Sequence, residues 1–159
     1  MGKNAKREQF RDRIGDFGDP DPYALEACLL DDLTTREVGE LGERLVAHFL
    51  RTCGYEIVER NYRCPEGEAD LIAFDPDDDE VVFIEVKTRR SRGLDGCAYP
   101  EEAVNAKKQR RYRRIASYYA MTHFPVPHIR FDTVGVTLAP GCVADIDHEL
   151  GAFDWDCGR

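Results

Sequence analysis

The amino-acid sequence predicts an α/β domain whose elements follow the order α-β-β-β-α-β. Two long segments carry apolar residues at helical spacing, three strand-like runs lie between them, and a fourth run follows the second helix. The chain has 159 residues, of which 42% are hydrophobic, so it is long enough for one domain with a real core.

The first expected helix is the segment "TTREVGELGERLVAHFLRTCGY". Thr34 and Glu37 have the spacing of a capping box, and Gly54 is expected to end the helix. Gly39 and Gly42 fall beside the apolar stripe and weaken the helix, and a glycine on a buried face indicates that another backbone comes close. The residues of that stripe are Val38, Leu41, Leu45 and Phe49.

The three expected strands are "YEIVERNYR", "EADLIAF" and "VVFIEVKT", and the acidic turn "DPDDDE" joins the last two. The second helix is expected over "YPEEAVNAKKQRRYRRIASYYA", with Pro100 and two glutamates in its first turn, where such residues are favoured. "IRFDTVGVTL" is a further strand, and "CVADIDHEL" is a candidate for another.

The ends of the chain read differently from its middle. Glycines and prolines interrupt residues 1–33, which we expect to form an N-terminal extension of uncertain order, and residues 151–159 are expected to form an acidic tail. No apolar run approaches the length of a membrane span, and the N-terminus lacks the apolar core of a signal peptide. The sequence therefore favours a cytoplasmic protein, and its six cysteines, none in a CxxC pair, are expected to be free thiols.

Acidic residues occupy strand positions in the hairpin that spans Gly67–Arg90. Folding this stretch symmetrically about its turn gives four facing pairs, namely Phe74 with Val81, Ile72 with Phe83, Asp70 with Glu85, and Glu68 with Lys87. Facing residues have Cβ atoms about 4.5–5.5 Å apart, and like charges there are destabilising. A proton could compensate by raising one pKa. A divalent cation is the better candidate, because hard cations take oxygen ligands, and Lys87 can help to neutralise the pair.

An exposed sheet edge is the alternative reading of these acids, since carboxylates are harmless there. The run "VVFI" argues against it, because a strand that is apolar on both faces is central and covered on both sides. The acids come where that buried strand ends, at a cleft. The sequence therefore predicts a metal site at the end of a buried sheet.

Two residues on the helices have ambiguous positions. Glu43 lies at the margin of the apolar arc of the first helix, where it could lean toward the sheet or stay solvated. Lys108 sits on the apolar stripe of the second helix, next to Gln109, and either snorkels out along that stripe or points into the cleft. The other residues of that stripe are Val104, Tyr112, Ile115 and Tyr119.

The charge of the chain is unevenly distributed. The net charge of −9 argues, taken alone, against binding of a polyanion. From Val86 to Arg114, however, ten Lys and Arg residues face only three Asp and Glu residues, a local charge of +7. Such a segment suits a surface that follows nucleic-acid phosphates beside an acidic metal site, and we expect Arg89, Arg90, Lys108 and Gln109 to contact nucleic acid.

Five stretches together resemble the PD-(D/E)XK nuclease superfamily, and most closely the YraN-like family of small bacterial endonuclease-like proteins. They are "GELGERLVAHFL", "GEAD", "FIEVKTRR", "AVNAKKQ" and "RFD", which run in family order from Gly39 to Asp132. The resemblance implies a restriction-endonuclease-like αβββαβ core, in which a mixed central sheet is flanked by helices. Residues 34–150 would then form the nuclease-like domain.

By position, the resemblance also implies roles for individual residues. Glu43, Asp70, Glu85 and Lys87 would be catalytic, and the three carboxylates among them would hold Mg²⁺ or Mn²⁺. Lys87 would orient or activate a water that attacks a phosphodiester. Lys108 and Gln109 match a Lys-Gln pair of the second helix.

We therefore expect a metal-dependent nuclease that acts on DNA, in repair, recombination or uptake. A catalytically weak nucleic-acid-binding module on the same fold is the second hypothesis, and a protein-interaction module is the third. An enzyme that cuts DNA junctions would need two sites and hence a homodimer.

Overall fold

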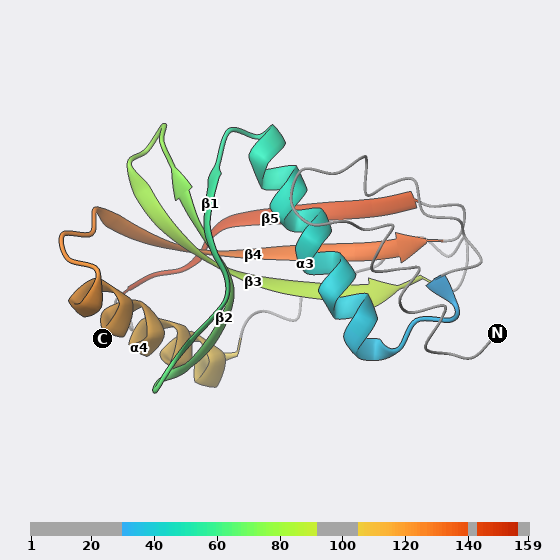
Figure 1. The fold of residues 1–159 in the computed structure, drawn as a ribbon, viewed down its shortest axis with the longest axis horizontal. Coiled ribbons are helices and arrows are strands. Elements are labelled where there is room, and N and C mark those ends of the chain that lie inside the picture. The colour runs from blue at the N-terminus through green and yellow to red at the C-terminus, as the bar shows by residue number, and fades with distance from the viewer. Residues whose placement is uncertain (1–29, 92–104, 140–142, 156–159) are drawn as a thin grey trace.

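The computed structural model describes residues 30–91, 105–139 and 143–155 and confirms the α/β class (Figure 1). Its elements in chain order are α3 (Thr35–Thr52), β1 (Glu56–Cys64), β2 (Gly67–Asp75), β3 (Glu80–Arg90), α4 (Ala106–Thr122), β4 (His128–Ala139) and β5 (Val143–Phe153). They contain the expected αβββαβ core, with one further strand at its C-terminal end.

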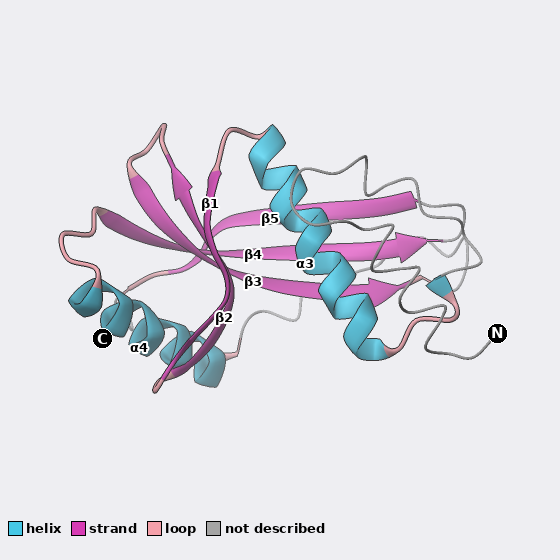
Figure 2. Cartoon of the chain, in the orientation of Figure 1, coloured by secondary structure: helices cyan, strands magenta, loops and turns pink. Residues whose placement is uncertain are grey.

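The strands form one five-stranded sheet in the order β1-β2-β3-β4-β5. β3 and β4 run parallel, whereas the other neighbours are antiparallel, so the sheet is mixed. Parallel neighbours need a crossover connection, and α4 lies within it. The two long helices and the twisted sheet are separated clearly in Figure 2.

Each face of the sheet is covered by its own apolar cluster. Val82 and Ile84 of β3 pack with α3, whereas Val81 and Phe83 pack with α4. All four side chains are buried, which confirms that β3 is a central strand covered on both sides.

α3 begins as the sequence predicts. The Thr34 and Glu37 side chains each accept a hydrogen bond from the other residue's backbone N–H, which completes the capping box. A Cβ added at Gly42 would lie 1.7 Å from the Thr88 Oγ1 atom of β3, so glycine is required there, although the close neighbour is a side chain and not the expected backbone. Gly39 has nothing within 4 Å of such a Cβ, so the same expectation is wrong there.

α4 begins later than expected. Asn105 is extended and caps the helix, since its side chain accepts a hydrogen bond from the Lys108 N–H. The prediction that Pro100 and two glutamates occupy the first turn is therefore wrong, because this cap fixes the first helical residue as Ala106. Residues 92–104 lie outside the described part of the chain.

The C-terminal end also differs from the expectation. β5 continues to Phe153, which is buried against the α4 side of the sheet, so residues 151–153 are not part of a tail. The apolar Phe153 anchors them, and residues 156–159 lie outside the described part. At the other end, Leu30 packs into the α3-side core, and residues 1–29 are likewise outside.

Two further expectations bear on the described residues. Cys53 and Cys64 are free thiols, and the other four cysteines lie outside the described ranges. None of the helices described is long and apolar enough to cross a membrane.

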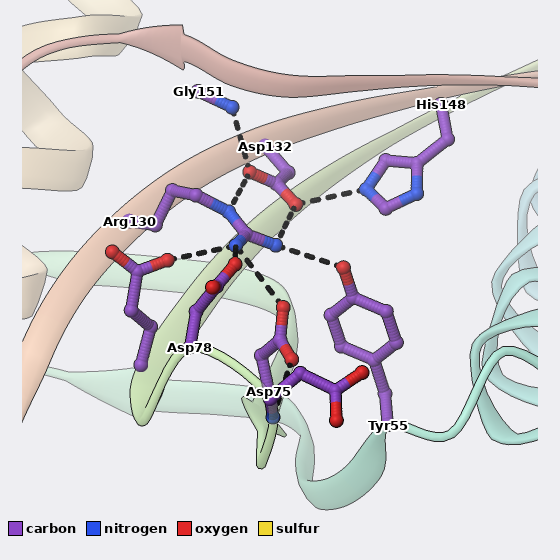
Figure 3. Close-up of polar contacts among 9 residues, drawn as sticks. Tyr55, Asp75, Asp78, Arg130, Asp132, His148 and Gly151 are labelled. Atoms are coloured by element: carbon purple, nitrogen blue, oxygen red, sulfur yellow. Dashed lines mark hydrogen bonds and ion pairs between the residues drawn. The ribbon is translucent and has the colours of Figure 1, made fainter.

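A buried ionic network anchors the turn end of the hairpin (Figure 3). The Arg130 guanidinium of β4 bonds to carboxylate oxygens of Asp75 at 3.1 Å, Glu80 at 2.7 Å and Asp132 at 2.9 Å. Its Nη2 also donates to the Tyr55 hydroxyl at 2.9 Å. Arg130 therefore joins both ends of the hairpin turn to β4 and to the segment after α3.

Asp132 is the most deeply buried carboxylate of this network. Burial would raise its pKa, but hydrogen bonds from His148, Arg130 and the Gly151 N–H outweigh burial and hold the pKa below its usual value. Asp132 of the "RFD" stretch pairs with Ile84 in the sheet, next to Glu85, but its printed side-chain contacts are with Arg130, His148 and the Gly151 N–H. The stretch thus has a structural role in the fold.

Candidate active site

The candidate site lies where β2 and β3 stop pairing. The expected register is confirmed for Phe74 with Val81 and Ile72 with Phe83, and the last pair is Leu71 with Ile84. Asp70 comes directly after that pair, and its Oδ2 accepts a hydrogen bond from the Val86 N–H at 2.8 Å. The Asp70 side chain thus accepts a hydrogen bond from the β3 backbone just beyond the end of the β2–β3 ladder. This bond holds the Asp70 carboxylate against β3.

Asp70 is half-buried, and its surroundings disfavour the charged form of its carboxylate. Burial raises its pKa, and the negative charges of Glu85 and Glu43 raise it further, to about 7. The Val86 N–H and the positive charge of Lys108 act in the opposite direction without restoring the usual value of 3.8. The site therefore favours either a proton on Asp70 or additional positive charge beside it.

Glu85 is buried, with 6% of its surface exposed, and points to the α4 side of the sheet. The Lys108 ammonium of α4 forms an ion pair with its Oε1 atom. Of the two alternatives for Lys108, the structure therefore supports the inward orientation, in which the side chain points toward Glu85 and not out along the stripe. The Lys108 side chain therefore does not snorkel toward solvent.

Glu43 approaches the same place from α3. Burial raises its pKa, against the effects of a hydrogen bond with the Asn61 side chain and of the Arg60 charge. Its charge acts on Asp70, so Glu43 leans toward the sheet as the first of its two readings proposed. Within the described ranges, however, no three His, Cys, Asp or Glu side chains converge closely enough to hold a metal ion.

The remaining predicted residues divide between the two sides of the sheet. Lys87 and Arg89 follow Glu85 along β3 at alternate positions, so they share its face. Arg90 points to the opposite side, where its guanidinium donates to the Leu33 carbonyl. Gln109 lies beside Lys108 on α4 and accepts a hydrogen bond from Arg113 at 3.3 Å. The structure thus brings Lys108 into contact with Glu85, places Lys87 and Arg89 on the face of Glu85, and keeps Arg90 on the opposite side.

Glu68 does not face Lys87 as the symmetric register implied. β2 pairs with β3 only from Leu71 onward, and Glu68, which precedes Leu71, pairs instead with Arg63 of β1. The two side chains form an exposed ion pair at 3.3 Å.

Tyr112 is a site residue that the sequence pattern did not indicate. Its hydroxyl hydrogen-bonds the Glu85 side chain and lies 3.5 Å from the Ile84 carbonyl. Burial, followed by the charges of Asp70 and Glu85, raises its pKa, so the hydroxyl stays protonated as a donor. Tyr112 lies one helical turn after Lys108, so the two side chains share a face of the helix, and this spacing could have indicated its role. From the sequence, Tyr112 is assigned only to the apolar stripe.

The oxygen donors suit a small hard cation. Asp70 and Glu85 lie beside each other, and Mg²⁺ is commonly held by one or two carboxylates with its remaining positions filled by water. Burial first, and then the charges of Glu85 and Glu43, raise the pKa of Asp70, and a divalent cation would stabilise its charged form. Such a cation would compete with Lys108 for Glu85.

Comparison with known proteins shows the family to which this chain belongs. The model of a family described as "Uncharacterised protein family UPF0102" matches residues 42–136, more than half of the chain. The chain belongs to the UPF0102 family. This is the YraN-like group that the sequence motifs indicated. Asp70, Glu85, Lys87 and Lys108 all lie inside the matched region.

Individual relatives support the same assignment. A UPF0102 protein of Nocardia farcinica is 46% identical over 117 residues, which cover 73% of this chain and 88% of the relative. One from Syntrophus aciditrophicus is 42% identical over 76% of this chain and 91% of its own length. One from Symbiobacterium thermophilum is 49% identical over 67% and 86%. These names give the family and state no reaction, so function must be argued from the site.

Proposed function

We propose that this UPF0102 protein is a cytoplasmic, metal-dependent nuclease that hydrolyses DNA phosphodiesters in repair, recombination or uptake. The observation that carries the proposal is the placement of Asp70 beside Glu85 at the end of a buried ladder. There the pKa of Asp70 is raised to about 7 by burial and by neighbouring carboxylates. A carboxylate whose pKa is perturbed by burial and by specific charged neighbours is typical of catalytic sites.

The chain's own groups have distinct roles in this proposal. Asp70, oriented by the Val86 N–H, and Glu85, oriented by Tyr112, would hold Mg²⁺ or Mn²⁺, with Glu43 as a further acidic group beside them. The cation, when bound, supplies Lewis acidity and positive charge for phosphodiester hydrolysis. Lys87 lies on the face of Glu85, where its ammonium would orient the attacking water and contact the phosphate.

The charge of α4 supports a nucleic-acid substrate. The helix carries six lysines and arginines and no acidic residue, although the whole chain has a net charge of −9. Phosphate-binding proteins concentrate positive charge in this manner beside the site they serve.

A catalytically weak binding module is the second candidate. The ion pair between Lys108 and Glu85 favours it, because this lysine already supplies positive charge where the cation would bind. In that case DNA would bind along α4 without being cut.

The test is cleavage of labelled duplex, single-stranded and four-way-junction DNA in Mg²⁺, in Mn²⁺ and in EDTA. Wild type is compared with Asp70→Asn and with Asp147→Asn, which removes an exposed carboxylate of β5. We expect metal-dependent cutting that is lost in Asp70→Asn and kept in Asp147→Asn. Binding without cutting under any condition would support the second candidate. Junction cutting would also require a homodimer, which sedimentation with and without DNA would detect.

A further inference from the structure

Exposed apolar side chains gather at the C-terminal end of α4. Tyr118, Met121 and Phe124 are 36%, 82% and 84% exposed and lie within a short stretch of chain. Single exposed apolar residues are normal on a protein surface, but a cluster of large ones usually marks a binding site. The large apolar side chains exposed elsewhere in the described residues are Val58, Leu150 and Trp155.

Cations occupy the other half of the same helix face. Lys107, Arg110 and Arg114 are exposed, and helical spacing places them on the outward side of α4 in line with Met121. Among the described residues, Arg114 has an ion-pair partner in Glu66, at 3.2 Å and largely exposed to water. The outward face thus changes from basic to apolar along its length.

The basic half of this face is the half nearest the candidate site. Lys107 and Arg110 flank Lys108, whose ammonium contacts Glu85. A rise of about 1.5 Å per residue places Met121 some 21 Å along the helix from Lys107. At the spacing of about 3.4 Å per nucleotide that one strand has in a duplex, this length corresponds to at most roughly six nucleotides, and an extended unpaired strand would cross it with fewer.

We propose that the outward face of α4 from Lys107 to Met121, together with Phe124 just after the helix, binds an unpaired DNA strand that leads into the site beside Asp70 and Glu85. The inference rests on the proposed function and specifies its substrate as single-stranded DNA, or a single-stranded segment of a larger DNA. Cations alone would serve a duplex equally well. The apolar half distinguishes the two, because only an unpaired strand exposes base faces that can stack on Phe124 and Tyr118.

The first experiment measures the affinity for a labelled oligothymidine and for a hairpin duplex by fluorescence anisotropy, in EDTA so that nothing is cut. Phe124→Leu keeps an apolar side chain but removes the ring, and Phe124→Tyr keeps the ring. We expect Phe124→Leu to weaken single-strand binding about tenfold, Phe124→Tyr to retain it, and duplex binding to be unchanged. Met121→Ala is an independent variant on the same face, and Leu150→Ala, on β5, is the control that should change nothing.

The cations are tested through salt dependence. Lys107→Gln combined with Arg110→Gln should lower the affinity for the single strand and make it less sensitive to salt, since fewer counterions are released. Arg36→Gln removes an exposed cation of α3 and is the matched control. Unchanged single-strand affinity in both the Phe124→Leu and the double variant would overturn the proposal. A Phe124→Leu protein with altered self-association but normal DNA affinity would do the same and would identify the apolar half as a protein interface.

A parallel cleavage assay separates this inference from the proposed function. Single-strand binding that depends on Phe124, without cutting in Mg²⁺, would support the proposed DNA-binding surface and contradict the proposed nuclease activity. Cutting that depends on Asp70, with equal rates in wild type and in all of the α4-surface variants, would support the proposed nuclease activity and contradict the proposed DNA-binding surface.

Discussion

The Lys108 ammonium of α4 contacts the Glu85 carboxylate of β3, and it does so at the centre of the candidate site. Lys108 is 38% exposed at its side chain and Glu85 only 8%, so the lysine can leave this contact more easily than the glutamate. In the absence of a metal, the helix therefore supplies the positive charge that the carboxylates lack. A divalent cation would have to displace or share this lysine.

Removal of Lys108 is expected to strengthen metal binding while it weakens catalysis. Lys108→Gln leaves Glu85 without its competing cation, so Mg²⁺ should raise the melting temperature more in the variant than in wild type. Lys107→Gln removes the neighbouring exposed charge and should leave the metal response unchanged. Isothermal titration with Mn²⁺ and melting curves at several Mg²⁺ concentrations provide the measurement. Equal metal affinity in wild type and Lys108→Gln would contradict the competition.

Asp70 should make the metal-free protein less stable as the pH rises. Its pKa is about 7 in the folded chain and 3.8 in the unfolded reference, so the unfolded state loses its proton first. The free energy of unfolding therefore falls between about pH 4 and pH 7, by up to about 4 kcal/mol if the full shift is realised. Asp70→Asn should reduce this decline, leaving the contribution of Glu43, whose pKa burial also raises, and should be the more stable protein at pH 8. Urea unfolding in EDTA at pH 5 and pH 8 tests this, with Asp147→Asn as the control; parallel curves for wild type and Asp70→Asn would refute it.

Arg130 is expected to be the most sensitive cation in the described part of the chain. Arg130→Met leaves the fully buried Asp132 and the nearly buried Asp75 without their main partner, which typically costs about 3–5 kcal/mol. Arg36→Met breaks one ion pair whose arginine is 87% exposed and should cost well under about 1 kcal/mol. Chemical denaturation compares the two.

The same network should fail in acid. The pKa values of Asp75 and Asp132 lie below their usual value, because hydrogen bonds from Arg130 and other donors outweigh the effect of burial. Both carboxylates therefore stabilise the fold at neutral pH, and this contribution is lost as the pH falls through their folded pKa values. Wild type should lose stability below about pH 4 more steeply than Arg130→Met. Melting temperatures of both proteins, measured from neutral pH to below about pH 4, test this prediction.

The two glycines of α3 provide a matched pair. Gly42→Ala places a Cβ 1.7 Å from the Thr88 Oγ1 atom and should push α3 away from β3, whereas Gly39→Ala meets nothing. The first change should destabilise the protein by about 1–3 kcal/mol and the second should stabilise it by up to about 1 kcal/mol, since alanine favours helix. A Gly42→Ala variant as stable as wild type would show that the helix can shift freely.

The sequence predicted what depends on local pattern. The capping box of α3 and the central position of β3 follow from spacing over a few residues, and the structure confirms both. The hairpin register is confirmed near the turn, for Phe74 with Val81 and Ile72 with Phe83, but the ladder ends at Leu71 and Ile84, before the predicted pairs of Asp70 and Glu68. The start of α4 was misplaced because Pro100 and its glutamates are good first-turn residues, and Asn105 is a competing cap within the same stretch. Local preference could not choose between two plausible starts.

Contacts between distant segments were less accessible to sequence reasoning. Tyr112 reads as an apolar residue of a helical stripe until the sheet is in place and its hydroxyl meets Glu85. The Arg130 network joins residues from the hairpin, β4 and β5, and no spacing rule connects them. For Lys108, both orientations suited the helix alone, and only the position of β3 distinguished them.

The crossover between the parallel strands β3 and β4 also orders events in time. Asp70 and Glu85 come together in a hairpin that closes locally, whereas Lys108 and Tyr112 arrive with the helix of a connection that must first cross the sheet. We expect the nascent hairpin to carry repelling carboxylates until α4 docks, so refolding should be slower at pH 8 than at pH 5 and slower in wild type than in Asp70→Asn. Stopped-flow refolding at both pH values measures this, and equal rates would contradict it. The groups that equip the site for chemistry would thus be the ones that delay its assembly.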